Sequence, residues 1–395
     1  MADIYSYAHI TIAASAAKDG RGGCFRQPRQ PFEAPVARLV SPADPSQNIL
    51  HGYVYVTLPR HSFNTSVNKS PLGKRAWVTQ ERLLSTRTVF YGKDQLHWEC
   101  AEGAQFNEDG VPVNWIKDPP RAVFGLIKRN WSTMHREFYV LTEYEAWYAM
   151  VEQYTKRKIS RPEDKLPALS GLARRFAYRI AGNAAERHFA AGIWKGDMKS
   201  GLLWYRKTRK TPKGAGQTIP YRAPSWSWAA HDGPVFFHTN VHKKDYQATF
   251  ENLKIYVQHS GSNPFGSVLP GTFMQFTALV RTTTLRTRPR GFGSMIENPS
   301  HVFGEESKGE GIAWADEADL PTGDYQCVQI RVKQTLCNEE THEISNVIFL
   351  KPTGQKDEFL RIGFGRVEVR GICSTGNRPF FHEMDGCRRL RITIF

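Results

Sequence analysis

The chain has 395 residues, of which 40% are hydrophobic and 12% aromatic. It is therefore long enough for two domains, and its composition excludes a disordered chain. The net charge of +15 and the pI of about 9.5 permit attraction to anionic partners. The densest basic runs, Lys156–Lys158 and Arg206–Lys210, are short. We interpret them as a solvated basic face, with an anion-binding patch as the alternative.

Six cysteines are present, and none forms a Cys-x-x-Cys pair. Because no His cluster lies at zinc spacing either, we expect no metal site and free thiols in a reducing compartment, the cytoplasm. A bridge from Cys337 to Cys373 or Cys387 stays open. The sequence has no secretory leader pattern and no apolar run near the length of a membrane span, so we expect no membrane span.

The first hundred residues alternate between short elements and turns. Residues 3–8 predict a helix, residues 9–14 predict a buried strand, and Tyr53–Leu58 predicts another strand. Gly20–Gly23 is rich in glycine but lacks the strand–Gly-x-Gly-x-x-Gly–helix context of a dinucleotide site, so it predicts a turn. Residues 27–46 are rich in Pro and polar side chains and predict an extended surface loop.

A helix is predicted where Trp77, Gln80, Glu81 and Leu84 recur at i, i+3, i+4 and i+7, because these positions share one face. A carboxylate and an amide on this stripe are unusual for a core helix. Glu81 therefore either pairs with a cation, such as Arg75 or the neighbouring Arg82, or points into a cleft. We expect Trp77 to be buried against the strand that follows.

Two strands follow the helix. Residues 88–91 are β-branched or aromatic, as strands prefer. In the second strand Leu96, Trp98 and Cys100 alternate with His97 and Glu99, the pattern of a half-buried strand. We expect Trp98 and Cys100 on the buried face. Glu99 is expected on the opposite face, exposed or in a salt bridge, and His97 points away from Cys100, which argues against a nucleophilic cysteine.

The middle of the chain predicts helices after a linker at residues 107–120. Residues 143–158 carry Trp147, Val151 and Tyr154 at helical spacing. Ser160 is expected to cap a short helical turn that Pro167 interrupts before a longer helix. After residue 245 the pattern changes to β, with strands predicted at residues 253–258, 274–282, 325–332, 347–350 and 359–369. Residues 286–310 predict a long exposed loop.

The segment from Arg75 to Cys100 resembles the fungal heterokaryon incompatibility (HET) domain. In that family an Arg-x-Trp-x-x-Gln-Glu-x-x-x-Ser-x-Arg helix precedes a strand and a Trp-Glu-Cys strand. Met1–Ser15 is similar to the family's Met-x-x-Ile-Tyr-x-x-Ala-x-x-Thr-Ile-Ala-Ala segment. Arg222–Gly233 resembles the Ala-Pro-Ser-Trp-Ser-Trp signature that often follows the domain. Together the matches span roughly the first two-thirds of the chain.

The resemblance implies that part of the domain is missing. HET domains normally begin with a Tyr-x-x-Leu-Ser-Tyr-x-Trp-Gly strand and a second strand with Trp-Ile-Asp and Cys-Ile-Gln patterns, and neither occurs here. The chain therefore resembles a HET protein that lacks the first part of its domain. A sheet without its first strands exposes an apolar edge and one face, which favours association.

The fold class expected from these observations is α+β. The resemblance implies a flavodoxin-like parallel sheet similar to the Toll/interleukin-1 receptor (TIR) fold. We predict a partial α/β HET domain of this type at residues 1–105. A helical connector is predicted at residues 106–222, and a mainly antiparallel β region at residues 223–395.

Two classes of function remain open. The resemblance implies a protein of fungal self/non-self recognition and cell-death signalling that acts by association with a partner or with itself. The alternative is a TIR-like hydrolase that cleaves NAD, with Glu81 as catalytic carboxylate and Trp77 stacking the substrate. NAD would then be a substrate, and no resident cofactor is expected. The other interpretation gives Glu81 a structural role, in which Arg75 or backbone groups hold its carboxylate.

Other chemistry has little support in the sequence. Ser225 and Ser227 lack a Gly-x-Ser-x-Gly elbow, so we do not expect a serine hydrolase. Trp226 and Trp228 predict a packed junction between the helical part and the β region. Nucleic-acid binding is not expected, because no recognised motif accompanies the positive charge.

Overall fold

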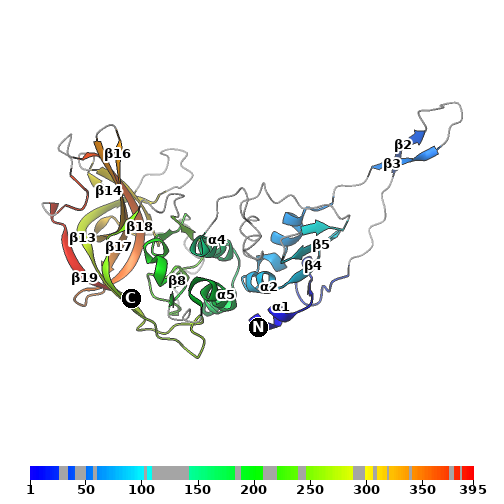
Figure 1. Cartoon of the computed structure of the whole chain (residues 1–395), viewed down its shortest axis with the longest axis horizontal. Helices are drawn as coiled ribbons and strands as arrows, with labels where there is room; N and C mark the ends of the chain where they lie inside the picture. Colours follow the sequence, from blue (N-terminus) through cyan, green and yellow to red (C-terminus); the bar gives the residue numbers. More distant parts are fainter. Residues whose placement is uncertain are drawn as a thin grey trace.

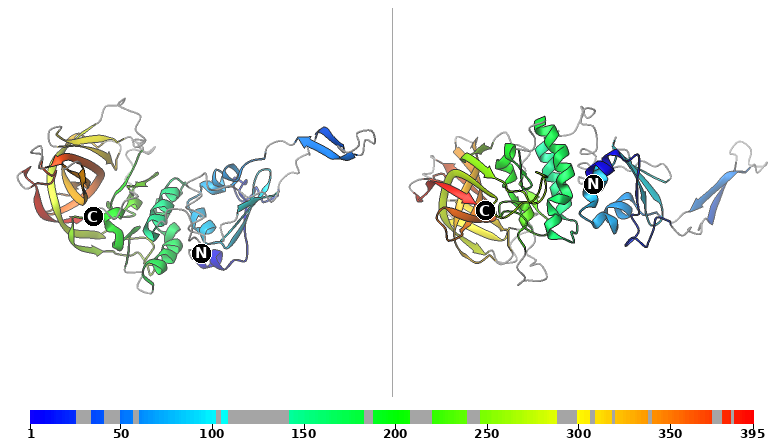
Figure 2. Two further views of the ribbon diagram at one scale, coloured as in Figure 1. Left: turned by 45° about the horizontal axis from the view of Figure 1, so that its top comes forward. Right: turned by 90° about the horizontal axis from the view of Figure 1, so that it is seen from below.

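The computed structural model describes residues 1–25, 34–40, 50–56, 60–101, 105–108, 142–182, 188–207, 220–238, 246–287, 299–305, 309–317, 320–337, 340–372, 378–382 and 385–395. It is a mixed α/β structure with a large antiparallel sheet in its C-terminal part. Two helices of the middle part, α4 and α5, lie between an N-terminal sheet and a C-terminal barrel (Figures 1 and 2). Within these residues, the linker predicted at 107–120 is described only at positions 107 and 108.

The N-terminal part is built on a four-stranded sheet in the order β1-β4-β5-β6. Strand β1 runs parallel to β4, and the other pairs are antiparallel. Its elements are α1 (Ala2–Tyr7), β1 (Thr11–Ala13), η2 (Asn64–Asn68), η3 (Leu72–Lys74), α2 (Val78–Leu84), β4 (Arg87–Tyr91), β5 (Leu96–Cys100) and β6 (Gln105–Asn107).

A separate hairpin, β2 (Ala34–Val40) with β3 (Leu50–Val56), extends away from this sheet (Figure 1). Strand β3 confirms the strand predicted at Tyr53–Leu58 up to residue 56. Strand β2 corrects the extended loop predicted over residues 27–46. Val36 and Val40 suit a strand, although the register shifts between Pro35 and Ala37. The remainder of that predicted loop lies outside the described residues.

The middle part is mainly helical, as predicted. Helix α4 (Glu143–Thr155) begins with a complete capping box between Thr142 and Glu145. The turn expected after Ser160 is η6 (Pro162–Lys165), but its N-cap residue is Arg161 and no side chain caps it. The remaining elements are η7 (Pro167–Leu169), α5 (Ser170–Ala181), β7 (Phe189–Ala190), β8 (Ile193–Trp194), η9 (Lys195–Asp197), α6 (Met198–Gly201), β9 (Trp204–Tyr205), η10 (Trp228–Ala230) and β10 (Phe236–Phe237).

The C-terminal part is a nine-stranded sheet within the described residues. Its strands are β11 (Gln247–Ala248), β12 (Glu251–Tyr256), β13 (Phe273–Thr287), β14 (His301–Glu305), β15 (Gly309–Ala315), β16 (Gly323–Cys337), β17 (Glu340–Pro352), β18 (Glu358–Ile372) and β19 (Arg388–Ile394). The pairings run from β13 through β16, β17, β18, β15 and β14 back to β13, so six strands close into a barrel.

A large antiparallel sheet in the C-terminal part is therefore confirmed, although its first strand begins at Gln247 rather than at residue 223. Two further details of the prediction are wrong. The loop expected at residues 286–310 contains β14 and the start of β15, which complete the barrel. Strand β19 was not predicted, and it pairs with β13 in antiparallel and with β18 in parallel fashion. Strand β14 is fixed by pairing with its neighbours β13 and β15, and β19 by pairing with a segment more than one hundred residues away.

One continuous core joins the middle part to the barrel. It extends from Ala76 to Ile394 and includes six tryptophans that are almost completely buried. They are Trp147, Trp194, Trp204, Trp226, Trp228 and Trp314. A second core fills the other end of the barrel around Phe303 and Phe349.

A buried ion pair of the barrel lies at the joint between these two parts. The side chains of Arg361 on β18 and Asp316 after β15 are both 0% exposed, with a 2.7 Å contact between nitrogen and oxygen. The guanidinium of Arg361 also lies 3.5 Å from the centre of the Trp204 ring and donates to the Trp204 carbonyl. Burial raises the pKa of Asp316 to about 6, although Arg361 opposes the shift.

We predict that Arg361→Ala lowers the free energy of unfolding by about 3–5 kcal/mol, because it leaves the Asp316 carboxylate buried without its partner. Urea denaturation measures the change. The control is Arg389→Ala, which removes a largely exposed pair with Glu251 and is expected to cost less than about 1 kcal/mol. Equal losses in the two variants would contradict this account of the joint.

A second prediction concerns Lys165, which is 4% exposed and donates to the His231 carbonyl. Burial, and then the charge of Arg222, lower its pKa to about 7. Above pH 7 the unfolded chain binds this proton more tightly than the folded protein does, so stability rises with pH, by up to about 1.4 kcal/mol per pH unit. Denaturation between pH 7 and 8.5 should show a steeper rise for the native protein than for Lys165→Met. Parallel curves would contradict the assignment.

Candidate functional site

Helix α2 carries the residues that the sequence marks most strongly, and each contacts a different element. The Trp77 indole nitrogen donates to the Asp164 carboxylate of η6 over 3.2 Å. The Gln80 side-chain oxygen accepts a 2.7 Å hydrogen bond from the backbone nitrogen of Gly171. Gly171 is the second residue of α5, so Gln80 satisfies one of the free N–H groups at the start of that helix.

The contact between α2 and α5 requires a glycine at position 171. A Cβ atom there would lie 2.7 Å from the Gln80 side-chain oxygen and 2.5 Å from the Cβ of Ala2 in α1. Three elements therefore meet at one residue without a side chain. The stripe predicted from Trp77, Gln80, Glu81 and Leu84 does face other elements, and its neighbours are α1 and the helical part.

Glu81 is half-buried and faces α1. It shares a hydrogen bond with Tyr5, and the positive charge of Arg75 acts on it. Burial raises the pKa of Glu81, while Arg75 and Tyr5 oppose the shift. Burial and then Glu81 raise the pKa of Tyr5. Of the two partners considered from the sequence, Arg75 acts on Glu81 and Arg82 does not.

Trp77 corrects one expectation. It is half-buried, and it packs against the core shared with the helical part, whereas Phe90 of β4 belongs to a separate small core with Ala13, Phe63 and Val67. The expectation of a Trp77 buried against β4 is therefore wrong. The hydrogen bond from the indole N–H to Asp164 explains why Trp77 points toward η6, because an indole N–H prefers a hydrogen-bond partner when it is removed from water.

Arg82 and Glu99 form a buried ion pair that the sequence did not reveal. Their side chains are 5% and 2% exposed, and Arg82 donates to both carboxylate oxygens of Glu99. Arg82 also donates to Asn68 over 2.8 Å and lies over the rings of Phe63 and Phe90. Loss of either partner would leave a buried charge unpaired, which would lower the stability of the folded protein.

This pair reverses the expected facing of β5. His97 and Glu99 are buried at 2% and 1%, while Leu96, Trp98 and Cys100 are only half-buried. The salt bridge considered for Glu99 is present, but the prediction that Trp98 and Cys100 occupy the buried face is wrong. His97 packs edge-on against Phe63, with ring centres 5.4 Å apart.

The opposite side of the sheet, which we call the outer face, is apolar. Register pairs Ile12 with Val89, Val89 with Trp98 and Trp98 with Phe106, so one side chain from each strand forms a continuous row. Ile12 is 61% exposed and the other three are half-buried. The buried strand expected at residues 9–14 is therefore shorter, because β1 spans only Thr11–Ala13. It is buried only on its inner side, at Ala13.

Two pockets lie beside this sheet. One, of about 470 Å³, lies at the carboxyl ends of β1 and β4 and includes Lys18, Arg21, Lys93 and the glycine loop. That loop is a turn, as predicted, held by a bond from the Gly22 nitrogen to the Asp19 carbonyl. The other, of about 620 Å³, lies between α1 and α5. Neither of these two pockets is lined by Trp77 or Glu81.

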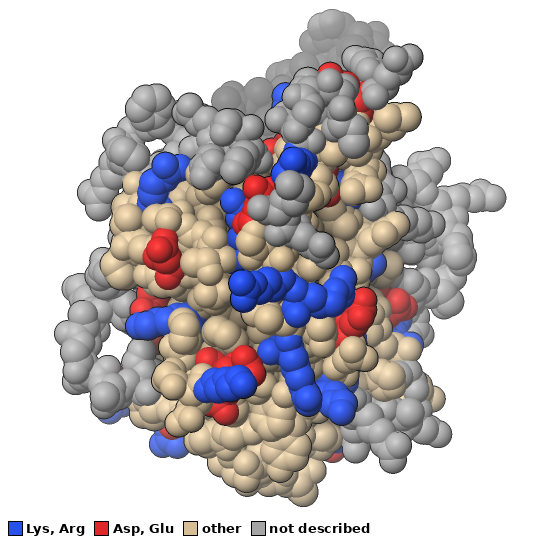
Figure 3. Space-filling view, turned by 90° about the vertical axis from the view of Figure 1, so that its left-hand side faces the viewer, with Lys and Arg blue, Asp and Glu red and all other residues tan. Residues whose placement is uncertain are grey.

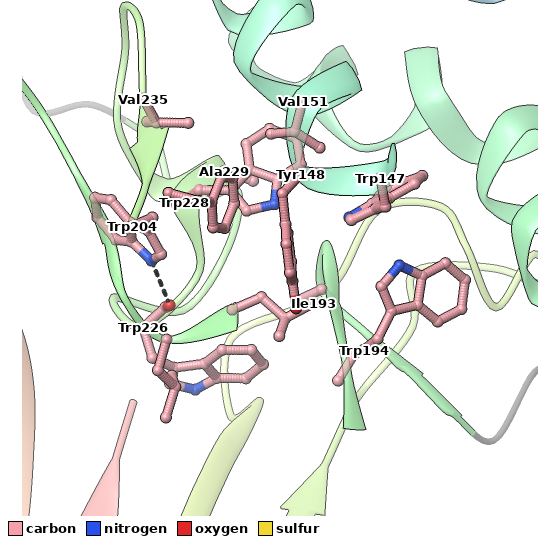
Figure 4. Close-up of a cluster of buried hydrophobic side chains, with 14 of the residues drawn as sticks. Trp147, Tyr148, Val151, Ile193, Trp194, Trp204, Trp226, Trp228, Ala229 and Val235 are labelled. Carbon is pink, nitrogen blue, oxygen red and sulfur yellow. Dashed lines mark hydrogen bonds between the residues drawn. The ribbon is translucent and has the colours of Figure 1, made fainter. Parts of the chain in front are cut away.

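The Arg222–Gly233 segment is a packed junction, as expected from its tryptophans (Figure 4). The Trp204 indole donates to the Trp226 carbonyl, and the Trp228 indole donates to the Gly192 carbonyl. Ser227 donates to the Ala191 carbonyl, and Ser225 donates to the Phe395 carbonyl. Both hydroxyls are thus engaged with backbone, which leaves this segment a structural role.

The basic residues have more specific contacts than a solvated face would give. Arg157 donates to the Gly73 carbonyl over 2.7 Å, and Arg206 donates to the Asp316 carbonyl. The interpretation of the two basic runs as wholly solvated is therefore wrong for these residues, and positions 208–210 lie outside the described residues. On the barrel face in Figure 3, Lys and Arg lie among Asp and Glu.

Among the described side chains, Cys24, Cys100, Cys327 and Cys387 are free thiols, which excludes the alternative bridge from Cys337 to Cys387. Cys373 lies outside the described residues. No group of three or more His, Cys, Asp or Glu within that same part of the chain could hold a metal ion. None of the helices there is long and apolar enough to cross a membrane.

Comparison of the chain with family models, with curated proteins and with solved structures gives no match.

We predict that Gly171→Ala lowers the free energy of unfolding by about 1–3 kcal/mol, because the added methyl group would overlap Gln80 and Ala2. Chemical denaturation provides the measurement. Gly20→Ala is the matched control, since a Cβ there meets nothing within 4 Å. If Gly171→Ala is as stable as Gly20→Ala, the close approach of α1, α2 and α5 at this residue is refuted.

Proposed function

We propose that this chain is a HET domain protein of fungal self/non-self recognition and cell-death signalling. It acts in the cytoplasm by association of two copies through β1 and the outer face. We further propose that its N-terminal part is a partial TIR-like unit. Strands β1 and β4 are parallel, and the chain that connects them contains α2. Such a crossover is what a parallel pair requires.

The single observation that carries this proposal is the exposure of an apolar segment at the sheet edge. Ile12 is 61% exposed on β1, and Ile4, Tyr7 and Ile10 nearby in the chain are also exposed. Several large apolar side chains in nine consecutive positions are unusual on a monomer surface, and such patches mark association sites. Their burial supplies the main driving force of most protein contacts.

The edge position of β1 favours a second copy as the occupant. Within the described residues, β1 pairs only with β4, so its other side offers backbone groups to another strand. Two identical strands can pair antiparallel about a two-fold axis, the commonest symmetry of homodimers. Ile12 of each copy would then lie in the contact and continue the apolar row of the outer face.

Charge does not oppose such a contact at this place. The chain carries +15 overall, but its first 17 residues contain no Lys or Arg and only one acidic residue, Asp3. Two copies that meet along this segment therefore bring no pair of cations together. More distant charges are screened at physiological salt, where the Debye length is about 8 Å.

The position of Glu81 argues against NAD cleavage, the alternative function. Ligands of parallel α/β sheets bind outside the carboxyl ends of the strands. Glu81 lies one turn before Ser85, whose hydroxyl is 2.8 Å from that of Thr11 at the start of β1. The carboxylate is thus near the amino ends, bonded to Tyr5, and the pocket at the carboxyl ends is lined by other residues.

We predict that Ile12→Glu converts a dimer into a monomer, because it places a carboxylate at the centre of the proposed contact. Light scattering coupled to size-exclusion chromatography measures the mass. The control is Leu336→Glu on the barrel, where the native leucine is 74% exposed and far from β1 in the sequence; this variant should keep the dimer. A monomeric native protein, or equal behaviour of the two variants, would refute association through β1.

The same proteins separate association from catalysis. Expression in a filamentous fungus should arrest growth with the native protein and with Glu81→Gln, and Ile12→Glu should abolish the arrest. Incubation of purified protein with NAD should release little nicotinamide. Turnover that disappears in Glu81→Gln, together with loss of growth arrest in that variant, would instead establish the hydrolase.

A further inference from the structure

Arg331 of β16 carries a buried charge at the joint between the barrel and the helical part. The residue is 0% exposed, and its guanidinium lies 4.4 Å from the centre of the Tyr246 ring. It donates to the His238 carbonyl, directly after β10, over 2.9 Å and to the side-chain oxygen of Asn346 on β17 over 2.8 Å. Burial lowers the pKa of Arg331 to about 10, so the group stays charged at neutral pH.

A comparison with Arg361 shows what Arg331 lacks. Both arginines face an aromatic ring and donate to a backbone carbonyl of the helical part. Arg361 also has the carboxylate of Asp316 at 2.7 Å, whereas the corresponding partner of Arg331 is the neutral amide of Asn346. Among the described residues no carboxylate lies within ion-pair distance of Arg331, and Asp197 acts on it from further away. A buried charge without an opposing charge in contact is costly.

Three nitrogen atoms in this cluster have no hydrogen-bond partner. They are Nη1 of Arg331, Nδ2 of Asn346 and Nε2 of His238, and the three residues are at most 8% exposed. Arg331 and Asn346 lie directly opposite each other on paired strands, so their side chains share one face of the sheet. Burial, and then the charge of Arg331, lower the pKa of His238 to about 3, so this ring is neutral. The first two nitrogens are donors, and a neutral imidazole can present a third N–H at Nε2.

These donors select the kind of ligand. A water molecule has two hydrogens that need acceptors of their own, and it brings no charge to offset the guanidinium. A larger organic anion needs room for further groups among side chains that are almost completely buried. A halide accepts from several N–H groups at once and carries one negative charge. We propose that Arg331, Asn346 and His238 bind a single chloride ion. It gives Arg331 the counter-charge that Asp316 gives Arg361.

The chloride ion links both sides of the joint. Arg331 and Asn346 belong to the barrel, and His238 follows the last strand of the helical part. A ligand that binds only the docked arrangement stabilises that arrangement by mass action. No residue of the N-terminal sheet contributes to the site, so this inference stands or fails separately from the association of two copies through β1.

The first test is a crystal structure of the native chain grown in sodium bromide, since bromide replaces chloride and is identified by its anomalous scattering. A bromide peak is expected within hydrogen-bonding distance of Nη1 of Arg331. An ordered water alone at this place would overturn the proposal.

The second test is thermal unfolding in sodium chloride and in sodium gluconate at equal ionic strength, so that general screening is the same in both. The midpoint of the native protein should be about 2 °C or more higher in chloride. Asn346→Asp places a carboxylate beside Arg331, and its midpoint should be the same in the two salts. Asn252→Asp is the matched control, because it adds the same charge at an exposed position of β12. It should keep the chloride dependence of the native protein.

The two tests together exclude a chance ion. A bromide peak combined with equal midpoints of the native protein in the two salts identifies an adventitious ion only and overturns the proposal. Chloride dependence that persists in Asn346→Asp overturns it as well. If that variant does not fold, Arg331→Met takes its place, because it removes the charge that needs the ion, and it should likewise lose the chloride dependence.

Discussion

The buried guanidinium of Arg361 is the interaction on which the joint between barrel and helical part depends. A charge with no exposure has to find its partners inside the protein. Arg361 finds the carboxylate of Asp316 within the barrel part, and the carbonyl and ring of Trp204 in β9 of the helical part. It has all of these partners only when both parts are docked. A shifted arrangement would leave a buried charge without partners, which is costly.

Side chains of one short helix connect the elements of the N-terminal part with one another and, together with the Arg75–Lys158 bridge and the bond from Arg157 to the Gly73 carbonyl, with the rest of the chain. From α2, Trp77 reaches η6, Gln80 reaches the start of α5, Glu81 reaches α1, and Arg82 reaches β5. Helix α2 has only seven residues, too few to be stable alone. Its polar residues therefore replace part of the apolar packing that a longer helix would provide. Their unusual place on an apolar stripe needs no ligand to explain it.

The sequence locates the strands of the N-terminal sheet more accurately than it predicts which side of each strand is buried. Alternation locates β5 correctly but cannot say which of its two sides is inside. The apolar side of β5 suggests that Trp98 is inside, yet the buried guanidinium of Arg82 draws Glu99 inward instead. The last strand β19 is missed for a different reason, since its partner β13 is far away in the chain.

Whether this sheet supports association or catalysis depends on which of its surfaces could gain free energy by contact with another molecule. A catalytic carboxylate has to be held near its substrate by a rigid surrounding. Glu81 is held, but by Tyr5 and Arg75, and it lies near the amino ends of β1 and β4. A substrate would have to displace those contacts. Ile12, by contrast, remains in water beside an open strand edge, and its burial requires no contact to be broken. Contact with a second chain, as we propose, would therefore be the less costly use of this surface, and it would cover Ile12, which the described residues leave 61% exposed.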